Sequence, residues 1–320
     1  MKTWQRIKND PKLMDKYLIR EKVIDTIRAF FKDQTFHEVF TPILVPIPSI
    51  EPNLEVFQTE LRTSKGLKRQ GFLIMSPEFS IKKLLAAGIG DCFEITKCFR
   101  NEEEISSLHN PEFTMLEWYR VGANYQDIMR DFENLFLKIV GKDKLSYQGE
   151  IYDLTLPWPR ISFKEAFAKF AGPKIEDVKD EDFYQIFFNE IEPKLRKSGR
   201  PAIIYDYPIS QAALARPKTS NPKFAERFEV FLAGVELGNC FSELTNAGEQ
   251  KKRFERDLAE RKWQGKTEYP IDEDLIEALK EGLPEVSGIA VGVDRLVMLA
   301  ANVSSISETM FFPGEEIFDL

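Results

Sequence analysis

Two runs of alternating side chains, 92–102 and 112–121, constrain the fold of this chain most strongly. Successive side chains of a β-strand point to opposite faces of a sheet, so this alternation predicts two strands with unlike faces. Along the second run, four side chains share one face: Phe113, Met115, Glu117 and Tyr119. Leu116 and Trp118 point the other way and, together with Phe99 of the first run, are expected to form a core.

The face opposite that core carries varied chemistry. The alternation adds Arg100 and Glu102 to it, so a guanidinium, carboxylates, a phenol and an aromatic ring are expected on one side of the predicted hairpin. A surface hairpin with a charged solvent face produces the same pattern. The pattern alone therefore leaves two interpretations open, a solvated surface and a binding site.

The other elements follow from apolar spacing, helix caps and breakers. Helices are expected at 10–33, 77–87, 125–140, 162–197, 249–264 and 272–281. Strands are expected at 36–44, 71–75, 224–244 with a turn at Ala233-Gly234, and 288–293 leading into a helix from Asp294. Pro42 should hold the first of these at a sheet edge or strand end. Neighbouring strands with loops too short for crossovers imply one α+β domain over residues 1–320, with a largely antiparallel sheet flanked by helices.

Charge and composition exclude several classes of function. The net charge is −8, whereas proteins that grip long nucleic acids usually present a basic face, so a basic surface on a protein partner is the better match. Cys92, Cys98 and Cys240 form no CxxC pair, which argues against a zinc site and a disulfide framework. No apolar run reaches about eighteen residues, so no membrane span is expected. The first residues do not resemble a signal peptide, and the cytoplasm is the expected location.

A second chemical signature closes the C-terminal part of the chain. The run from Gly288 to Arg295 places small residues on a strand and an arginine at the start of a helix. Glycine lets a ligand approach the backbone closely, and an arginine fork can hold phosphate oxygens. A glycine-rich strand is weak support alone, but its combination with the Phe99-Arg100-Asn101-Glu102 run is specific.

Together these segments resemble the three signature motifs of class II aminoacyl-tRNA synthetases. The 36–44 run resembles the first motif, which helps build the dimer interface of that family, so a homodimer is expected. The resemblance implies an antiparallel sheet that binds ATP in a bent form. It also implies that Arg100 holds the α-phosphate, Phe113 stacks on adenine and Arg295 holds the γ-phosphate side. Further nucleotide contacts are implied at Asn101, Glu102, His109, Asn110, Glu236, Leu237 and Gly292. For His109 a phosphate or ribose contact is favoured over a role as general base.

A further set of residues resembles the amino-acid pocket of the lysyl branch of this family. It comprises Ser76, Pro77, Glu78, Glu117, Tyr119, Asn239, Phe241, Glu243 and Ala290. Each glutamate alone is more simply explained as a surface residue, but three in the family's order suit a substrate with two ammonium groups. Glu229 and Glu236 fall where the family binds Mg²⁺. Strict alternation puts Glu236 opposite Asn239, so a β-bulge is expected, with Gly238 as its place.

Within the lysyl branch, three features favour an unusual member. The first motif follows only a short leader, 1–12, so the anticodon-binding OB domain of full lysyl-tRNA synthetases is expected to be absent. Ser76 and Ala290 stand where the synthetases usually carry alanine and glycine. These features resemble the elongation factor P–(R)-β-lysine ligase family, whose members adenylate (R)-β-lysine and pass it to a lysine ε-amine of that factor. Cys240 and Thr35 depart from the family pattern, since both replace a usual glycine.

The resemblance therefore implies ATP and Mg²⁺ as cofactors, elongation factor P as protein substrate, and (R)-β-lysine or lysine as the activated acid. Binding of tRNA is not expected. Two other functions stay open at this point. One is a stand-alone lysine-activating relative that charges tRNA or another acceptor, and the other is a synthetase-like binding protein without catalysis.

Overall fold

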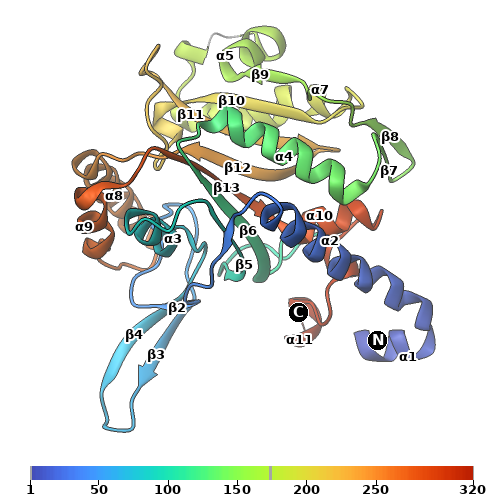
Figure 1. Cartoon of the computed structure of the whole chain (residues 1–320), viewed down its shortest axis with the longest axis horizontal. Coiled ribbons are helices and arrows are strands. Elements are labelled where there is room, and N and C mark those ends of the chain that lie inside the picture. Colours follow the sequence, from blue (N-terminus) through green and yellow to red (C-terminus); the bar gives the residue numbers. More distant parts are fainter. Residues whose placement is uncertain (1, 173–174, 320) are drawn as a thin grey trace. The chain divides into compact units, whose positions relative to one another are not determined.

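The computed structural model describes residues 2–172 and 175–319 of the chain. These residues form two compact units (Figure 1). Unit 1 comprises Met1–Trp118, Thr245–Pro284 and Gly292–Leu320, and unit 2 comprises Tyr119–Leu244 and Glu285–Val291. Within the described residues, no helix is long and apolar enough to cross a bilayer.

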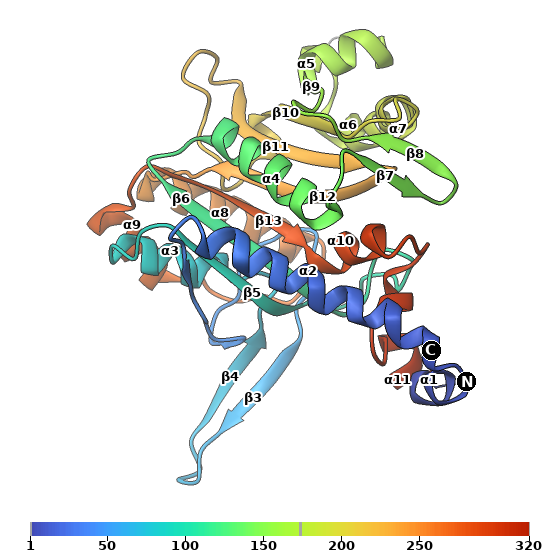
Figure 2. The same ribbon diagram turned by 45° about the vertical axis from the view of Figure 1, so that its right-hand side comes forward.

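Unit 1 is built on β1 (His37–Glu38), β5 (Cys92–Phe99) and β6 (Glu112–Val121), which are neighbours in that order. The short β1 runs parallel to β5 at the edge. A separate antiparallel sheet contains β2 (Leu44–Val45), β4 (Lys68–Leu73) and β3 (Gln58–Arg62). The β3–β4 hairpin projects away from the rest of unit 1 (Figures 1 and 2).

Helix α2 (Met14–Lys32) covers one face of β5 and β6 because its apolar side chains pack there. The ring of Phe31 lies 5.0 Å from the rings of both Phe93 and Trp118, and all three side chains are buried. Helix α2 is preceded by α1 (Thr3–Asn9) and a 3₁₀ turn (Pro11–Leu13). Asp10 caps this turn, because its carboxylate accepts a hydrogen bond from Lys12 N. The predicted helix start and the core position of Trp118 are therefore confirmed.

The end of α2 explains the unusual residue in the first motif. Phe36 N donates to Phe31 O and Thr35 N donates to Lys32 O, which is the hydrogen-bond pattern of a Schellman cap. The rings of Phe31 and Phe36 also contact each other at 5.1 Å. Thr35 occupies the left-handed position of this cap, with φ 64°. Glycine is favoured there because a side chain, and a β-branched one above all, is strained in that conformation.

The other helices of unit 1 are α3, α8, α9, α10 and α11, with bounds Glu78–Ala86, Ala247–Trp263, Glu273–Gly282, Val293–Ala300 and Gly314–Ile317, and a 3₁₀ turn at Ile306–Thr309. The rings of Phe79 on α3 and Phe254 on α8 pack together, with their centres 5.3 Å apart. Helices α1 and α11 lie side by side (Figure 2), and Thr3 N donates to the Glu316 carboxylate at 2.9 Å.

Unit 2 contains a sheet in the order β13 (Val286–Gly292), β12 (Val235–Ser242), β11 (Phe224–Leu232), β10 (Ala202–Pro208) and β9 (Arg160–Ser162). Neighbours are antiparallel except β9 and β10, which are parallel. Helix α4 (Tyr125–Val140) packs on one face, where Tyr125 N donates to Ser242 Oγ at 2.9 Å. A small hairpin, β7 (Lys144–Tyr147) and β8 (Glu150–Asp153), follows α4.

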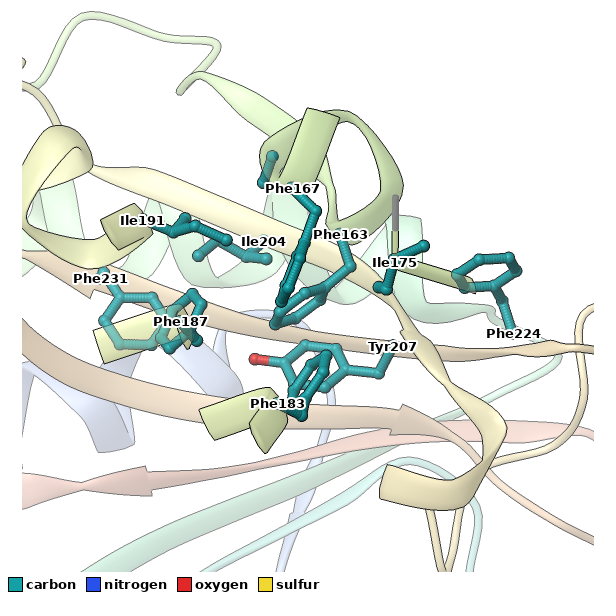
Figure 3. Close-up of a cluster of buried hydrophobic side chains, with 11 residues drawn as sticks. Phe163, Phe167, Ile175, Phe183, Phe187, Ile191, Ile204, Tyr207, Phe224 and Phe231 are labelled. Carbon is teal, nitrogen blue, oxygen red and sulfur yellow. The ribbon is translucent and has the colours of Figure 1, made fainter. Parts of the chain in front are cut away.

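The opposite face of this sheet is covered by short helices between residues 163 and 196. They are α5 (Phe163–Ala166), α6 (Asp180–Ile186) and α7 (Glu192–Arg196), with a 3₁₀ turn at Ile175–Asp177 and π-helical segments at Phe167–Ala171 and Phe187–Ile191. Their phenylalanines pack on Ile204, Tyr207 and Phe231 of the strands (Figure 3). The predicted helical stretch 162–197 is therefore confirmed in large part, but as short segments rather than one helix, with Ser162 in β9 and a break at 178–179. Residues 173 and 174 lie outside the described residues.

Two structural predictions need correction. The strand expected at 36–44 is reduced to His37–Glu38 and a separate β2, because Pro42 lacks the N–H that a continuing ladder requires. The ring of Phe99 does not pack on Trp118 but on Phe57, with the two ring centres 6.4 Å apart. The helices at 77–87 and 125–140, strand β6 and the Ala233-Gly234 turn agree with prediction. Strands β3 and β7 to β10 were not predicted.

Candidate active site

Arg100 follows β5 directly and lies against the ring of Phe113 on β6. Its guanidinium carbon is 5.0 Å from the ring centre, a cation–π distance, and its Nη1 is 3.7 Å from Glu103 Oε1. The predicted association of the two motif residues is therefore present. Glu102 is not on the same strand face, because β5 ends at Phe99 and Glu102 takes a left-handed φ of 56°.

Arg295, at the start of α10, contacts His109. Its Nη2 lies 3.0 Å from His109 Nε2, and His109 Nδ1 lies 3.0 Å from Ser106 Oγ. A guanidinium only donates, so Nε2 is the acceptor and the ring proton is on Nδ1. His109 is thereby oriented as a partner of Arg295, and its predicted phosphate or ribose contact stays a prediction.

Asp294 fixes the helix that carries Arg295. Its carboxylate accepts from Thr114 N at 2.7 Å and from Arg20 Nη2 at 2.5 Å, and the side chain is buried. These bonds join α10 to β6 and to α2. Sequence reasoning missed this residue as a positioning group, although an acidic side chain in the first turn of a helix is favoured electrostatically.

Asn110 organises the loop before β6. Its Oδ1 accepts from Gly314 N at 2.8 Å and its Nδ2 donates to Glu112 O at 2.6 Å. A Cβ on Gly314 would lie 3.1 Å from that Oδ1, which accounts for the glycine. Nearby, Asn101 N donates to Glu55 O at 2.9 Å. Nucleotide contacts by Asn101 and Asn110 stay predictions.

The unit 1 part of the predicted amino-acid pocket is held by hydrogen bonds. Ser76 Oγ donates to Glu117 Oε1 at 2.6 Å and accepts from Glu78 N at 3.0 Å, next to Pro77 at the start of α3. Glu78 already has a cationic partner, because Lys82 Nζ lies 2.6 Å away and is itself buried. The charge of Glu78 is therefore balanced without a substrate ammonium group, and its contact with the amino acid stays a prediction.

The unit 2 part lies on one face of β12 and β13. Val230 pairs with Gly238 but Phe231 pairs with Glu236, so Leu237 is the extra residue of a bulge. This bulge, expected at Gly238, brings Glu236 to the same face as Asn239 and Phe241. Gly238 has little room for a side chain, since a Cβ would lie 3.0 Å from Ile289 Cδ1.

Two residues of β13 complete this face. Ala290 pairs with Asn239 across the ladder, and Gly288 pairs with Phe241. A Cβ on Gly288 would lie 2.3 Å from ring atoms of Tyr119, so this glycine makes room for the tyrosine rather than for a ligand. At Gly292, by contrast, a Cβ would meet only Arg295 atoms, the nearest at 3.5 Å.

Glu229 and Glu236 belong to the same sheet face and supply two hard oxygen donors. No group of three or more His, Cys, Asp or Glu side chains that could hold a metal occurs within 2–172 and 175–319. Mg²⁺ is commonly held by one or two carboxylates plus phosphate oxygens, so the pair fits a metal that arrives with a nucleotide. Burial and the negative charge of Glu236 raise the pKa of Glu229 to about 7, while Arg227 opposes the shift.

Glu243 is buried just beyond β12, with 1 % of its surface exposed, and its N donates to Val286 O at 3.0 Å. The neighbouring Cys240 points the opposite way, buried beside Ser287, and burial raises the pKa of its thiol. Cys240 is therefore part of the core rather than of the predicted pocket surface.

The family model described as tRNA synthetases class II (D, K and N) matches residues 2–316. The chain belongs to this family. Curated relatives align over nearly the full length of both chains, and each is named "Elongation factor P--(R)-beta-lysine ligase". The chain is 40 % identical over 309 residues to the protein from Proteus mirabilis, covering 92 % of this chain and 94 % of the relative. It is 40 % identical over 305 residues to that from Vibrio atlanticus, with the same coverage. For Enterobacter sp. the identity is 38 % over 324 residues, with 97 % of each chain covered.

Membership in the class II family places the predicted motifs in context. The α+β architecture with a mainly antiparallel sheet is the expected one. The family resemblance inferred from Arg100, Phe113 and Arg295 is thereby confirmed.

Proposed function

We propose that this class II protein is an ATP-dependent ligase that adenylates (R)-β-lysine and transfers it to a lysine ε-amine of elongation factor P. The observation that carries the proposal is the near-full-length similarity to relatives named for that activity. Three free, buried cysteines suit a reducing compartment, and we propose that the enzyme acts in the cytoplasm.

The chemistry requires positioning and charge stabilisation more than acid–base catalysis. In the first step a carboxylate oxygen of the amino acid bonds to the α-phosphorus of ATP, and the bond to pyrophosphate breaks. In the second, the neutral ε-amine attacks the acyl carbon, AMP leaves, and the amine loses a proton to solvent. We assign Arg100 to the α-phosphate and Arg295, oriented with His109, to the leaving pyrophosphate.

The buried carboxylates support a diamino substrate. Lys82 lies beside Glu78, and we assign the two other buried acids of the set, Glu117 and Glu243, to the ammonium groups of the substrate. Ser76 holds Glu117 in place. Glu229 and Glu236 would hold Mg²⁺, which supplies charge neutralisation at the phosphates when bound.

A homodimer is part of the proposal. In the first-motif region Phe40 is 77 % exposed, and Ile43 and Leu44 are each 41 % exposed. Large apolar side chains gathered on one segment are typical of a surface that a partner covers. A second copy of the chain is the partner we propose, as the first motif implies.

Activation of L-lysine for tRNA is the second candidate, favoured by the match to a family of tRNA synthetases. The net charge of −8 weighs against it, since tRNA binding draws on phosphate neutralisation. A transfer assay separates the two. Elongation factor P and, separately, lysine tRNA are incubated with enzyme, ATP, Mg²⁺ and either lysine isomer. The mass of each acceptor is then measured by mass spectrometry.

The proposal predicts a mass gain of one β-lysyl group on the protein acceptor and none on tRNA. The Arg100→Ala variant is the inactive control. A gain on tRNA alone would favour the second candidate, and no gain on either acceptor with a folded enzyme would contradict both.

A further inference from the structure

Arg227 on β11 is a buried cation that neither the motifs nor the proposed chemistry uses. Its side chain is 11 % exposed. Its Nε donates to Asn239 Oδ1 at 3.0 Å, and its Nη2 donates to Glu229 Oε1 at 2.6 Å. One guanidinium therefore joins an amide assigned to the amino-acid pocket with a carboxylate assigned to the metal.

The guanidinium is itself held firmly. Its Nη1 donates to the carbonyl of Gln211, and its guanidinium carbon lies 4.2 Å from the centre of the Tyr207 ring. Tyr207 belongs to the apolar cluster between the sheet and the short helices (Figure 3). Arg227 thus connects the packed core of unit 2 to the polar face of β12.

The direction of these hydrogen bonds determines what Asn239 can offer a ligand. A guanidinium has five N–H donors and no acceptor, so the Asn239 atom that faces Arg227 must be the carbonyl oxygen. The NH₂ end then points away from Arg227 and is a donor. Ala290, directly across the ladder, leaves only a methyl group beside it.

We propose that Arg227 is a positioning residue that orients the Asn239 amide so that its NH₂ group donates to the carboxylate of the activated amino acid. The proposal rests on the proposed function for the identity of that ligand. Arg227 itself contacts no substrate in this arrangement. Its fork also keeps Glu229 in register with Asn239, since these two residues pair across β11 and β12.

Steady-state pyrophosphate exchange with R227K, R227M, N239A and the double variant R227M/N239A tests this assignment. Lysine carries the charge but cannot span both acceptors as a planar fork does. We expect R227K and R227M each to raise the KM for (R)-β-lysine about tenfold, the scale of one lost hydrogen bond. Adding R227M to N239A should leave that KM unchanged, because Arg227 acts through Asn239.

Arg216 provides a matched control. Its Nε lies 2.9 Å from a carboxylate oxygen of Glu226. Glu226 precedes Arg227 on β11, so its side chain points to the opposite face of the sheet. R216M removes a comparable ion pair and should leave the KM at its parent value. Parent KM values in R227K, or additive effects in the double variant, would overturn the assignment.

A spectroscopic readout keeps this test independent of the substrate. In ¹⁵N-labelled protein the Asn239 side-chain NH₂ signals, identified by their loss in N239A, should move or broaden in R227M and stay in place in R216M. Unchanged signals in R227M would refute the positioning role even if the ligase reaction is correct. Parent protein that exchanges with no lysine isomer, yet shows the expected signal change, would instead refute the proposed function.

Discussion

Replacing Gly288 by alanine is the sharpest steric perturbation that the predicted pocket offers. The new Cβ would lie 2.3 Å from Cδ1 and Cε1 of Tyr119, well inside contact distance. Tyr119 is 3 % exposed and cannot turn into open space. Either the ring or strand β13 must shift by about 1 Å, and overpacking of this kind costs about 1–3 kcal/mol.

Gly292 on the same strand is the control, since its added Cβ would meet only Arg295 atoms, at 3.5 Å and beyond. An unfolding entropy of about 2.1 cal/mol/K per residue gives about 1.5 °C of Tm per kcal/mol for 320 residues, so we expect G288A to unfold about 1–5 °C below the parent, while G292A unfolds with it. Differential scanning fluorimetry measures both. In exchange assays G288A should raise the KM for the amino acid more than that for ATP, and G292A the reverse. Equal Tm values for the two variants would refute the steric argument.

Three further predictions follow from other parts of the molecule. T35G should raise the free energy of unfolding in urea by up to about 1 kcal/mol, because the left-handed cap position strains threonine, and a lower value would contradict the Schellman assignment. A290G should shift preference towards α-lysine within a range of about 1–3 kcal/mol, measured as the ratio of kcat/KM values, and an unchanged ratio would remove Ala290 from the specificity argument. Cys92, Cys98 and Cys240 should resist thiol reagents at pH 8 in the folded protein and react in urea, because burial raises the pKa of all three, that of Cys92 to about 12.

Elements with a strong local signal could be predicted from the sequence. Strand β6 was predicted from its alternation, and the start of the α2 segment from Asp10-Pro11, because these signals depend on neighbouring residues. The bulge before Gly238 was predicted from a conflict, since Glu236 and Asn239 could share a face only if one residue was extra. Such reasoning succeeds where function and geometry constrain the same few residues.

The residues that sequence reasoning missed act through contacts between distant segments. Asp294 contacts Thr114 and Arg20, which both lie far from it along the chain. No local sequence pattern predicts such contacts. Arg227 has a weak signal in the sequence, because it and Glu229 lie two residues apart and therefore on the same strand face. Its hydrogen bond to Asn239, however, depends on the bulged register of β12. Gly288 was interpreted as room for a ligand, and only the fold reveals that Tyr119 takes that room.

In the proposed function, buried glutamates select a diamino acid while the motif arginines bind ATP. Pyrophosphate exchange by the parent and by Glu243→Gln, with (R)-β-lysine, L-lysine and L-leucine as substrates, tests it most directly. We expect exchange with the lysine isomers only. For the variant we expect the KM for (R)-β-lysine to be at least about tenfold higher and the KM for ATP to be unchanged, because one charge-assisted contact is lost. Exchange with leucine, or a variant whose KM for (R)-β-lysine equals that of the parent, would contradict it.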